Sequence, residues 1–278
     1  MALYLGNKKV AVTKTIEKQV PSMKAFFEAG GRCQGSAATS FEGCWQYDDA
    51  KNVVSTNHLF YGCSSLKFLP PLNISNSNSM WNMFYNCYGL ETISKLEVHN
   101  IESMQGAFYY CRNLIVLPDL DTSKVTNMEK AFYGCEKLTS IPQYDTSKVT
   151  NMGDMLSNCS NITNIPQLDT SSVTNMNYTF NYCTKLNSIP KLNVANVTKM
   201  NGVFQACHSL EAIHMININA NLDIHYSTKF TREALLEIIG NLKAQTSGTK
   251  TLTMGATNLA KLTDEDKAIA TNKGWTLA

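Results

Sequence analysis

The sequence predicts an α/β fold built as a solenoid: a stack of 24-residue coils, each with a short strand and a short helix, closed by an α/β cap at its C-terminal end. The first observation is a cysteine that returns every 24 residues without an insertion. The second is a set of apolar residues at constant distances from it. The seven cysteines are Cys63, Cys87, Cys111, Cys135, Cys159, Cys183 and Cys207.

The apolar residues keep the same spacing in all seven coils. Leu or Ile stands three residues after each cysteine, and an aromatic or leucine stands three residues before it. These preceding residues are Phe60, Phe84, Phe108, Phe132, Leu156, Phe180 and Phe204. The period lies in the leucine-rich-repeat range, so we expect a leucine-rich-repeat-like solenoid. A single coil of this length cannot bury its own apolar residues, and neighbouring coils must therefore stack on one another.

Three segments make up each predicted coil. Met, Phe and Cys at positions i, i+4 and i+7, as in Met128, Phe132 and Cys135, predict a short helix with one apolar face. Residues 138–144 are expected to be extended, because a proline in this segment excludes a helix. Residues 121–127 carry Asp, Thr, Ser and Asn, which are typical of turns and helix starts.

Three regions follow from this pattern. Residues 1–20 are predicted to dock the protein to a larger particle, and residues 21–226 to form the solenoid, with regular repeats over residues 50–218. Residues 227–278 are predicted to cap its end. Weaker traces of the repeat predict terminal capping coils. These traces are Val20, Met23, Phe27, Phe41 and Cys44.

The capping region has its own predicted elements. We expect a helix over residues 230–242, a strand at residues 251–254, a second helix that starts after Thr263, and a last strand at residues 275–277. Thr231 and Thr263 are suited to cap the two helices. Together these elements would shield the apolar end of the stack.

Composition excludes some classes of function. The formal net charge is +2, so no electrostatic footprint for nucleic acid is visible. No apolar run approaches the about 20 residues that a membrane-spanning helix needs, and we expect no membrane insertion. The first ten residues lack a signal-peptide pattern, which favours a protein that stays in the cytosol where it is made.

The repeated polar residues were weighed as chemical sites. The cysteines are predicted to be buried core residues, although neighbours in one column could approach disulfide distance. Asp121, Asp145 and Asp169 share one position, where a cation such as calcium could bridge them; turn capping by each side chain is favoured. No catalytic residues, metal site or cofactor are predicted, and the chain is not expected to be an enzyme.

An aromatic column is the candidate binding surface. It consists of Tyr61, Tyr85, Tyr109 and Tyr133, with Trp81, Tyr88 and Tyr110 nearby in the repeat. Aromatic rings with polar tips suit protein or sugar contacts, which makes these seven residues the predicted binding site. The alternative is that the tyrosines only pack on one another, and the sequence supports both interpretations equally.

The segment Asp-Thr-Ser-Lys-Val-Thr-Asn-Met, followed by Ala-Phe-Tyr-Gly-Cys-Glu-Lys-Leu-Thr-Ser-Ile-Pro, spans residues 121–142. Residues 50–218, which repeat it, resemble the BspA-like bacterial surface leucine-rich-repeat family. That resemblance implies a right-handed solenoid that binds proteins or host surfaces without catalytic residues. The opening residues 3–10 and the C-terminal segment are similar to tail or fibre-type structural proteins of gut bacteriophages.

These resemblances imply a non-enzymatic binding or structural protein. The first hypothesis is a bacteriophage virion component, a fibre, tail or capsid-associated protein assembled in the bacterial cytoplasm. The alternative is a bacterial cell-surface adhesin of the BspA-like family. The expected partners are other virion proteins, or a protein or glycan of a host cell surface, and a homo-oligomer is possible in either case.

Overall fold

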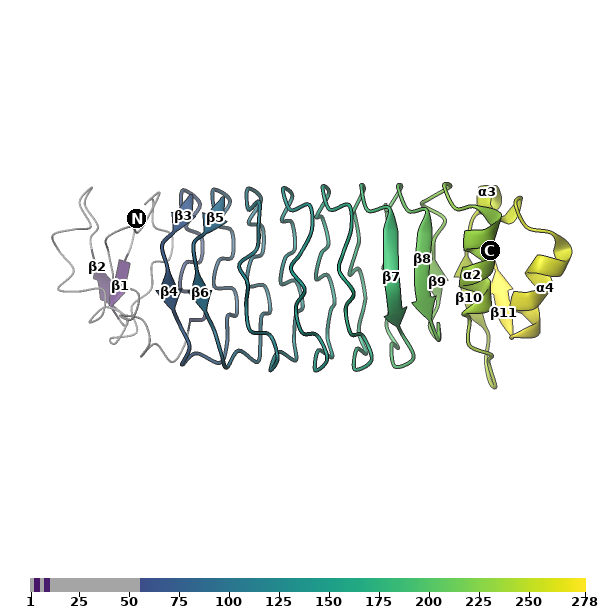
Figure 1. Cartoon of the computed structure of the whole chain (residues 1–278), viewed down its shortest axis with the longest axis horizontal. Helices are drawn as coiled ribbons and strands as arrows, with labels where there is room; N and C mark the ends of the chain where they lie inside the picture. The colour runs from purple at the N-terminus through teal and green to yellow at the C-terminus, as the bar shows by residue number, and fades with distance from the viewer. Residues whose placement is uncertain (1–2, 6–7, 11–55) are drawn as a thin grey trace.

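The computed structural model of the chain describes residues 3–5, 8–10 and 56–278. From residue 56 onward, Figure 1 shows successive coils side by side along one long axis, with the C-terminal helices at one end. Strand β1 (Leu3–Leu5) pairs antiparallel with β2 (Lys8–Val10). The remainder of the predicted docking segment, and the predicted capping coils from Val20 to Cys44, lie outside the described residues.

Neighbouring coils pair in parallel with the register that the repeat predicts. Phe68 pairs with Thr92, and Leu72 with Leu96, each 24 residues apart. A row of isolated bridges continues this register along Ser79, Ser103, Asn127, Asn151, Asn175 and Lys199. The strands of the stack are β3 (Phe68–Leu69), β4 (Leu72–Asn73), β5 (Thr92–Ile93), β6 (Leu96–Glu97), β7 (Ser188–Asn193) and β8 (Ala212–Ile216).

The prediction of a short helix in each coil is wrong. Between residues 56 and 226 the structure contains turns at these positions and no helix. Alternate N–H groups donate within the coil, as from Cys87 to the Phe84 carbonyl (3.1 Å), and across to the next coil, as from Phe84 to the Ala107 carbonyl (2.8 Å). A helix would use every one of these groups internally. The turns instead use half of them to join neighbouring coils.

Residues with positive φ explain why the helix does not form. Two positions in each coil, five residues and one residue before the cysteine, lie in the left-handed region, where an α-helix cannot continue. The first position is occupied by His58, Asn82, Gly106, Lys130, Asp154, Tyr178 and Gly202, and the second by Gly62, Asn86, Tyr110, Gly134, Asn158, Tyr182 and Ala206.

The predicted strand is also absent from several coils. Ser94 donates its N–H to the Leu69 carbonyl (3.1 Å), but Pro118, Pro142 and Pro166 stand at the same position of later coils and have no N–H. Residues 114–120, 138–144 and 162–168 accordingly form no strand. Pairing returns between β7 and β8, where His214 replaces the proline.

The apolar core is a set of columns that run along the stack. The rings of Phe60, Phe84 and Phe108 are buried and stacked, with centroids 5.2 and 5.3 Å apart. Where Leu156 replaces Phe, the buried ring of Tyr144 stacks on Phe132 instead, at 6.0 Å. The structure thus fills the space above the smaller side chain with an aromatic ring from another part of the coil.

The buried cysteine column is confirmed. All seven cysteines of the repeat are buried and free. Six of their thiols donate to the carbonyl 27 residues earlier, with Sγ to oxygen distances between 2.9 and 3.2 Å. The thiol therefore satisfies a buried carbonyl of the preceding coil, besides packing as a small apolar group.

The C-terminal elements agree with their predictions. Thr231 and Thr263 cap the two longer helices, and Thr263 forms a capping box with Asp266. The two oxygens of Asp266 accept from Arg232, at 2.7 and 2.8 Å, which joins the helices. The elements are β9 (Leu222–Asp223), α2 (Arg232–Gly240), β10 (Lys250–Thr253), α3 (Ala256–Leu259), α4 (Asp264–Asn272) and β11 (Trp275–Leu277). Strands β9, β10 and β11 pair in parallel, so this segment continues the stacking direction of the coils.

Replacing Gly134 with Ala should destabilise the fold. Its φ is +70°, and a Cβ there would lie 2.3 Å from Cδ1 of Tyr110. We expect the free energy of unfolding to fall by about 1–2 kcal/mol in urea denaturation. Gly240 is the matched control, because nothing lies within 4 Å of its Cβ position. Equal effects of the two substitutions would contradict the backbone assignment at Gly134.

Alkaline pH should also destabilise the fold. Burial raises the pKa of Cys159 and of Cys207 to about 12, and that of Cys87, Cys135 and Cys183 well above the ordinary value. Unfolded thiols ionise near pH 8.5, so the stabilisation is complete below about pH 8.5 and decreases as pH rises toward the folded pKa.

Each such thiol contributes up to about 1.4 kcal/mol per pH unit above that point. Urea midpoints measured between about pH 8 and 10 should therefore fall steeply, and less steeply in a variant that combines Cys135→Ala and Cys159→Ala. A midpoint independent of pH would contradict the burial of the thiols.

Candidate functional site

The four tyrosines of the predicted binding column stack on one another. Ring centroids are 4.7 Å apart between Tyr61 and Tyr85, 4.3 Å between Tyr85 and Tyr109, and 4.7 Å between Tyr109 and Tyr133. All four are partly buried. The 24-residue register places them above each other, so the column presents ring edges and hydroxyl groups to solvent.

Burial changes the ionisation of the column. It is the main cause that raises the pKa of Tyr133 to about 12, with a hydrogen bond to Tyr110 as the second cause. Burial also raises the pKa of Tyr85 and Tyr109. These phenols are therefore neutral hydrogen-bonding groups near neutral pH, and none of them is prepared to act as a base.

Three further aromatic residues of the prediction lie around the column. Tyr110 meets Tyr109 and Tyr133 edge-on, with interplanar angles of 72° and 88°. The guanidinium of Arg112 lies 4.9 Å from the ring centroid of Tyr110 and 5.2 Å from that of Tyr88. Sequence reasoning did not single out Arg112, which follows its cysteine by one residue.

Trp81 and Tyr88 are the exposed members of the predicted site. Their exposed fractions are 43% and 38%. Trp81 contacts His58 edge-on, with ring centroids 4.6 Å apart, so its position is fixed although its surface is open to solvent. We define Tyr61, Tyr85, Tyr109, Tyr133, Trp81, Tyr88, Tyr110 and Arg112 as the N-terminal aromatic patch.

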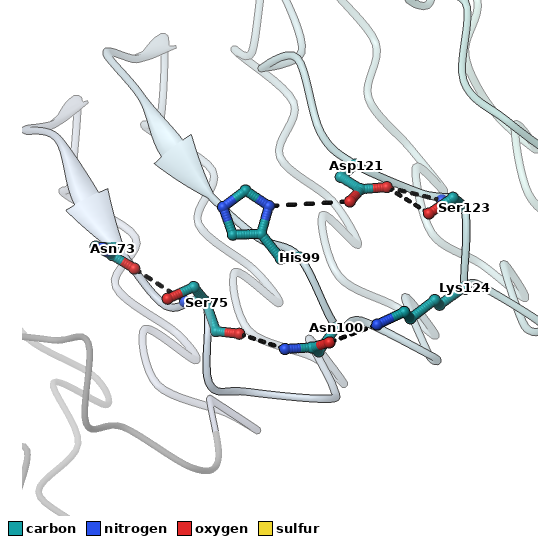
Figure 2. Close-up of polar contacts among 7 residues, drawn as sticks. All are labelled: Asn73, Ser75, His99, Asn100, Asp121, Ser123 and Lys124. Atoms are coloured by element: carbon teal, nitrogen blue, oxygen red, sulfur yellow. Dashed lines mark hydrogen bonds and ion pairs between the residues drawn. The ribbon is translucent and has the colours of Figure 1, made fainter.

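On a different segment of each coil, the shared aspartates form turn caps. Oδ1 of Asp121 accepts hydrogen bonds from the N–H (3.1 Å) and the hydroxyl (2.6 Å) of Ser123 (Figure 2). Asp145 and Asp169 make the same two contacts two residues ahead. The hydroxyl bond is the main cause that lowers the pKa of Asp121. This agrees with the turn-capping interpretation.

The coils that lack the Asp-Thr-Ser sequence make an equivalent turn. Oδ1 of Asn73 accepts from the N–H of Ser75 (3.0 Å), as a capping aspartate does. Asn100 donates to the Ser75 carbonyl (3.0 Å) and accepts from Lys124 (2.6 Å), which connects three coils (Figure 2).

His99, Asp121 and Ser123 do not form a nucleophilic site. The hydroxyl of Ser123 donates to Asp121, whereas the imidazole of His99 is 3.9 Å from the other carboxylate oxygen. A base must contact the hydroxyl in order to activate it, and here the carboxylate holds that proton in a turn. Among residues 3–5, 8–10 and 56–278, no three His, Cys, Asp or Glu side chains gather as metal ligands.

Two shallow grooves accompany the prolines, and sequence reasoning missed both. One of about 430 Å³ lies between residues 94–99 and 118–121, and one of about 420 Å³ between residues 143–147 and 167–170. The side chains of Gln143 and Gln167 donate to carbonyls of the following coil in the second groove. These amides partly replace the ladder hydrogen bonds that proline cannot donate.

The comparisons with known proteins concern the repeat region. A family model described as "Mycoplasma protein of unknown function, DUF285" matches residues 22–140 and 115–217. No curated protein matches the sequence. None of the helices in residues 56–278 combines the length and apolar character needed to cross a bilayer.

Replacing Asp121 with Ala should remove a turn cap, whereas Asp121→Asn should keep it, because Asn73 makes the same contact in another coil. We expect Asp121→Ala to lower the free energy of unfolding by about 1 kcal/mol and Asp121→Asn by much less. Thermal unfolding with and without calcium is the measurement. A large calcium-dependent increase in Tm that both substitutions remove would favour a bridging cation over turn capping.

Proposed function

Because the chain belongs to the family described as Mycoplasma protein of unknown function, DUF285, we infer that it is a non-enzymatic binding scaffold at a biological surface. The observation that carries this proposal is the N-terminal aromatic patch. Trp81 and Tyr88 expose their rings beside four stacked tyrosines and Arg112. Tyr, Trp and Arg are the residues that protein interfaces favour.

Rigidity of the patch supports a protein partner. Stacking and edge contacts already fix the rings of Tyr85, Tyr109 and Tyr110 in the free chain. Binding then costs little side-chain entropy, since these rings do not have to be ordered again. In this proposal the stacked tyrosines serve both interpretations of the sequence: they pack the coils, and they hold the exposed rings in place.

We propose a leucine-rich-repeat-like solenoid as the fold class that presents the patch. The parallel pairing at intervals of 24 residues supports it, as do the columns of buried Phe and Cys. A stack of this kind offers a long surface whose side chains vary from coil to coil, which is how repeat scaffolds acquire specificity.

Two locations are proposed for the scaffold. The similarity of residues 3–10 and of the C-terminal segment to phage tail and fibre proteins favours a virion component. The match to a family of the BspA-like repeat type favours the surface of a bacterial cell. Mass spectrometry of purified virions and of isolated cell envelopes distinguishes them, because the protein should be enriched in one of the two.

Substitution of the exposed rings should abolish binding without unfolding the chain. We expect the double variant Trp81→Ala and Tyr88→Ala to bind the enriched particle or envelope at least about tenfold more weakly, with Tm almost unchanged. Binding of fluorescently labelled chain in a sedimentation assay measures this. The control is Ile269→Ser, which removes an exposed apolar side chain from α4, far from the patch.

A second pair of substitutions separates binding from packing within the column. Tyr85→Ser and Tyr109→Ser introduce the residue that Ser157 provides at the equivalent position. If the column also forms part of the contact surface, binding falls more than stability does. Undiminished binding by both double variants would reject the patch as the partner site.

A further inference from the structure

A second pair of exposed aromatic residues lies three to four coils further along the stack. Tyr178 and Tyr182 belong to one coil, and their exposed fractions are 39% and 48%. Neither belongs to the N-terminal aromatic patch. Within residues 56–278, neither ring stacks on another aromatic ring or lies beneath a cation in the way that Tyr88 and Tyr110 do beneath Arg112.

Both tyrosines occupy backbone positions that large side chains disfavour. Their φ angles are +56° and +57°. Other coils mostly place small or flexible polar residues there, such as Asn82, Gly106 and Asn158. Bulky side chains in this region store backbone strain, which is typical of functional sites when burial does not offset it. Because the two rings remain exposed, burial in the core does not explain them.

The following coil provides a seat for the ring of Tyr178. Gly202 occupies the equivalent position there, and a Cβ on Gly202 would lie 2.4 Å from Cε1 and 2.6 Å from Cδ1 of Tyr178. The ring therefore rests directly on backbone that only glycine leaves open. One side of the ring is covered in this way, so its exposed surface is on the other side. This arrangement differs from the tyrosine column, where rings cover each other's faces.

The chemistry around the two rings is polar and almost uncharged. Side-chain amides surround them in the same and the next coil: Asn177, Asn181, Asn201 and Gln205. Oδ1 of Asn177 accepts from the N–H of Asn201 (2.8 Å), which fixes one amide between the coils. The nearest acid in the register is Asp154, one coil before Tyr178. A ligand here meets planar rings, amide groups and one carboxylate, and no cation faces it from these positions.

We propose that Tyr178 and Tyr182 form a binding site for a neutral oligosaccharide. The C–H face of a sugar ring packs on an exposed aromatic face, while its hydroxyl groups exchange hydrogen bonds with amides. An acidic polysaccharide would be repelled by Asp154 and would find no Arg or Lys to pair with. The site is independent of the N-terminal aromatic patch, because it uses other residues and another class of ligand.

The test uses the full chain and a defined set of hexasaccharides. Cellohexaose, chitohexaose and mannohexaose are the neutral probes, and a hexamer of galacturonic acid is the acidic probe. Isothermal titration calorimetry at millimolar sugar should detect binding of at least one neutral probe and no binding of the acidic one. The double variant Tyr178→Asn and Tyr182→Asn should weaken that binding by about tenfold or more.

Asparagine is the matched substitution, because Asn82 and Asn158 occupy the same two positions in other coils with positive φ. The double variant should therefore fold, with a Tm equal to or above that of the original chain. Tyr85→Ser with Tyr109→Ser should leave sugar binding intact. Absence of binding by all three neutral probes, equal binding by the double variant, or preferential binding of the acidic hexamer would each overturn the proposal.

Discussion

The hydrogen bond from a backbone N–H of one coil to a carbonyl of the next is the interaction on which the rest of the molecule depends. Phe60 and Phe84 each donate in this way, at 2.8 Å, and the pattern continues along the stack. Because these bonds hold the register at 24 residues, every side chain lies against its equivalent in the neighbouring coil. The aromatic column, the cysteine column and the turn caps all result from this register.

The left-handed residues make this bond possible. They turn the peptide groups so that alternate N–H groups point along the stack and not back into their own coil. Proline acts in the opposite way on the extended segment, where it removes the donor and opens shallow grooves beside Gln143 and Gln167. Two features of the backbone thus determine the molecule's two surfaces, a tightly joined turn side and a looser proline side.

The sequence predicted what depends on apolar spacing. The buried position of Cys87 and its equivalents, the caps at Thr231 and Thr263, and the last strands followed from residue type and distance alone. It did not predict the turns that replace the helix, since a Met, Phe and Cys at i, i+4 and i+7 share one face in both structures. The signal was present in Asn82, Gly106, Asp154 and Gly202, which occupy one column and favour positive φ.

The candidate site was predictable in part for a similar reason. The tyrosine column follows from the register, but the exposure of Trp81 and the position of Arg112 over two rings depend on three-dimensional packing. Tyr178 and Tyr182 were missed because tyrosine gives no sign in the sequence that its backbone is left-handed. The glycine of the next coil, Gly202, was the only trace of that conformation.

The thiol contact has a consequence for the length of the array. Each thiol reaches a carbonyl exactly one coil back, and it finds the same group whichever coil precedes it. Recombination that removes or duplicates one whole unit therefore leaves both new neighbours with complete partners, whereas a loss of any other size breaks every column at once. Such a gene can change the reach of its product in steps of one unit while the interior stays intact.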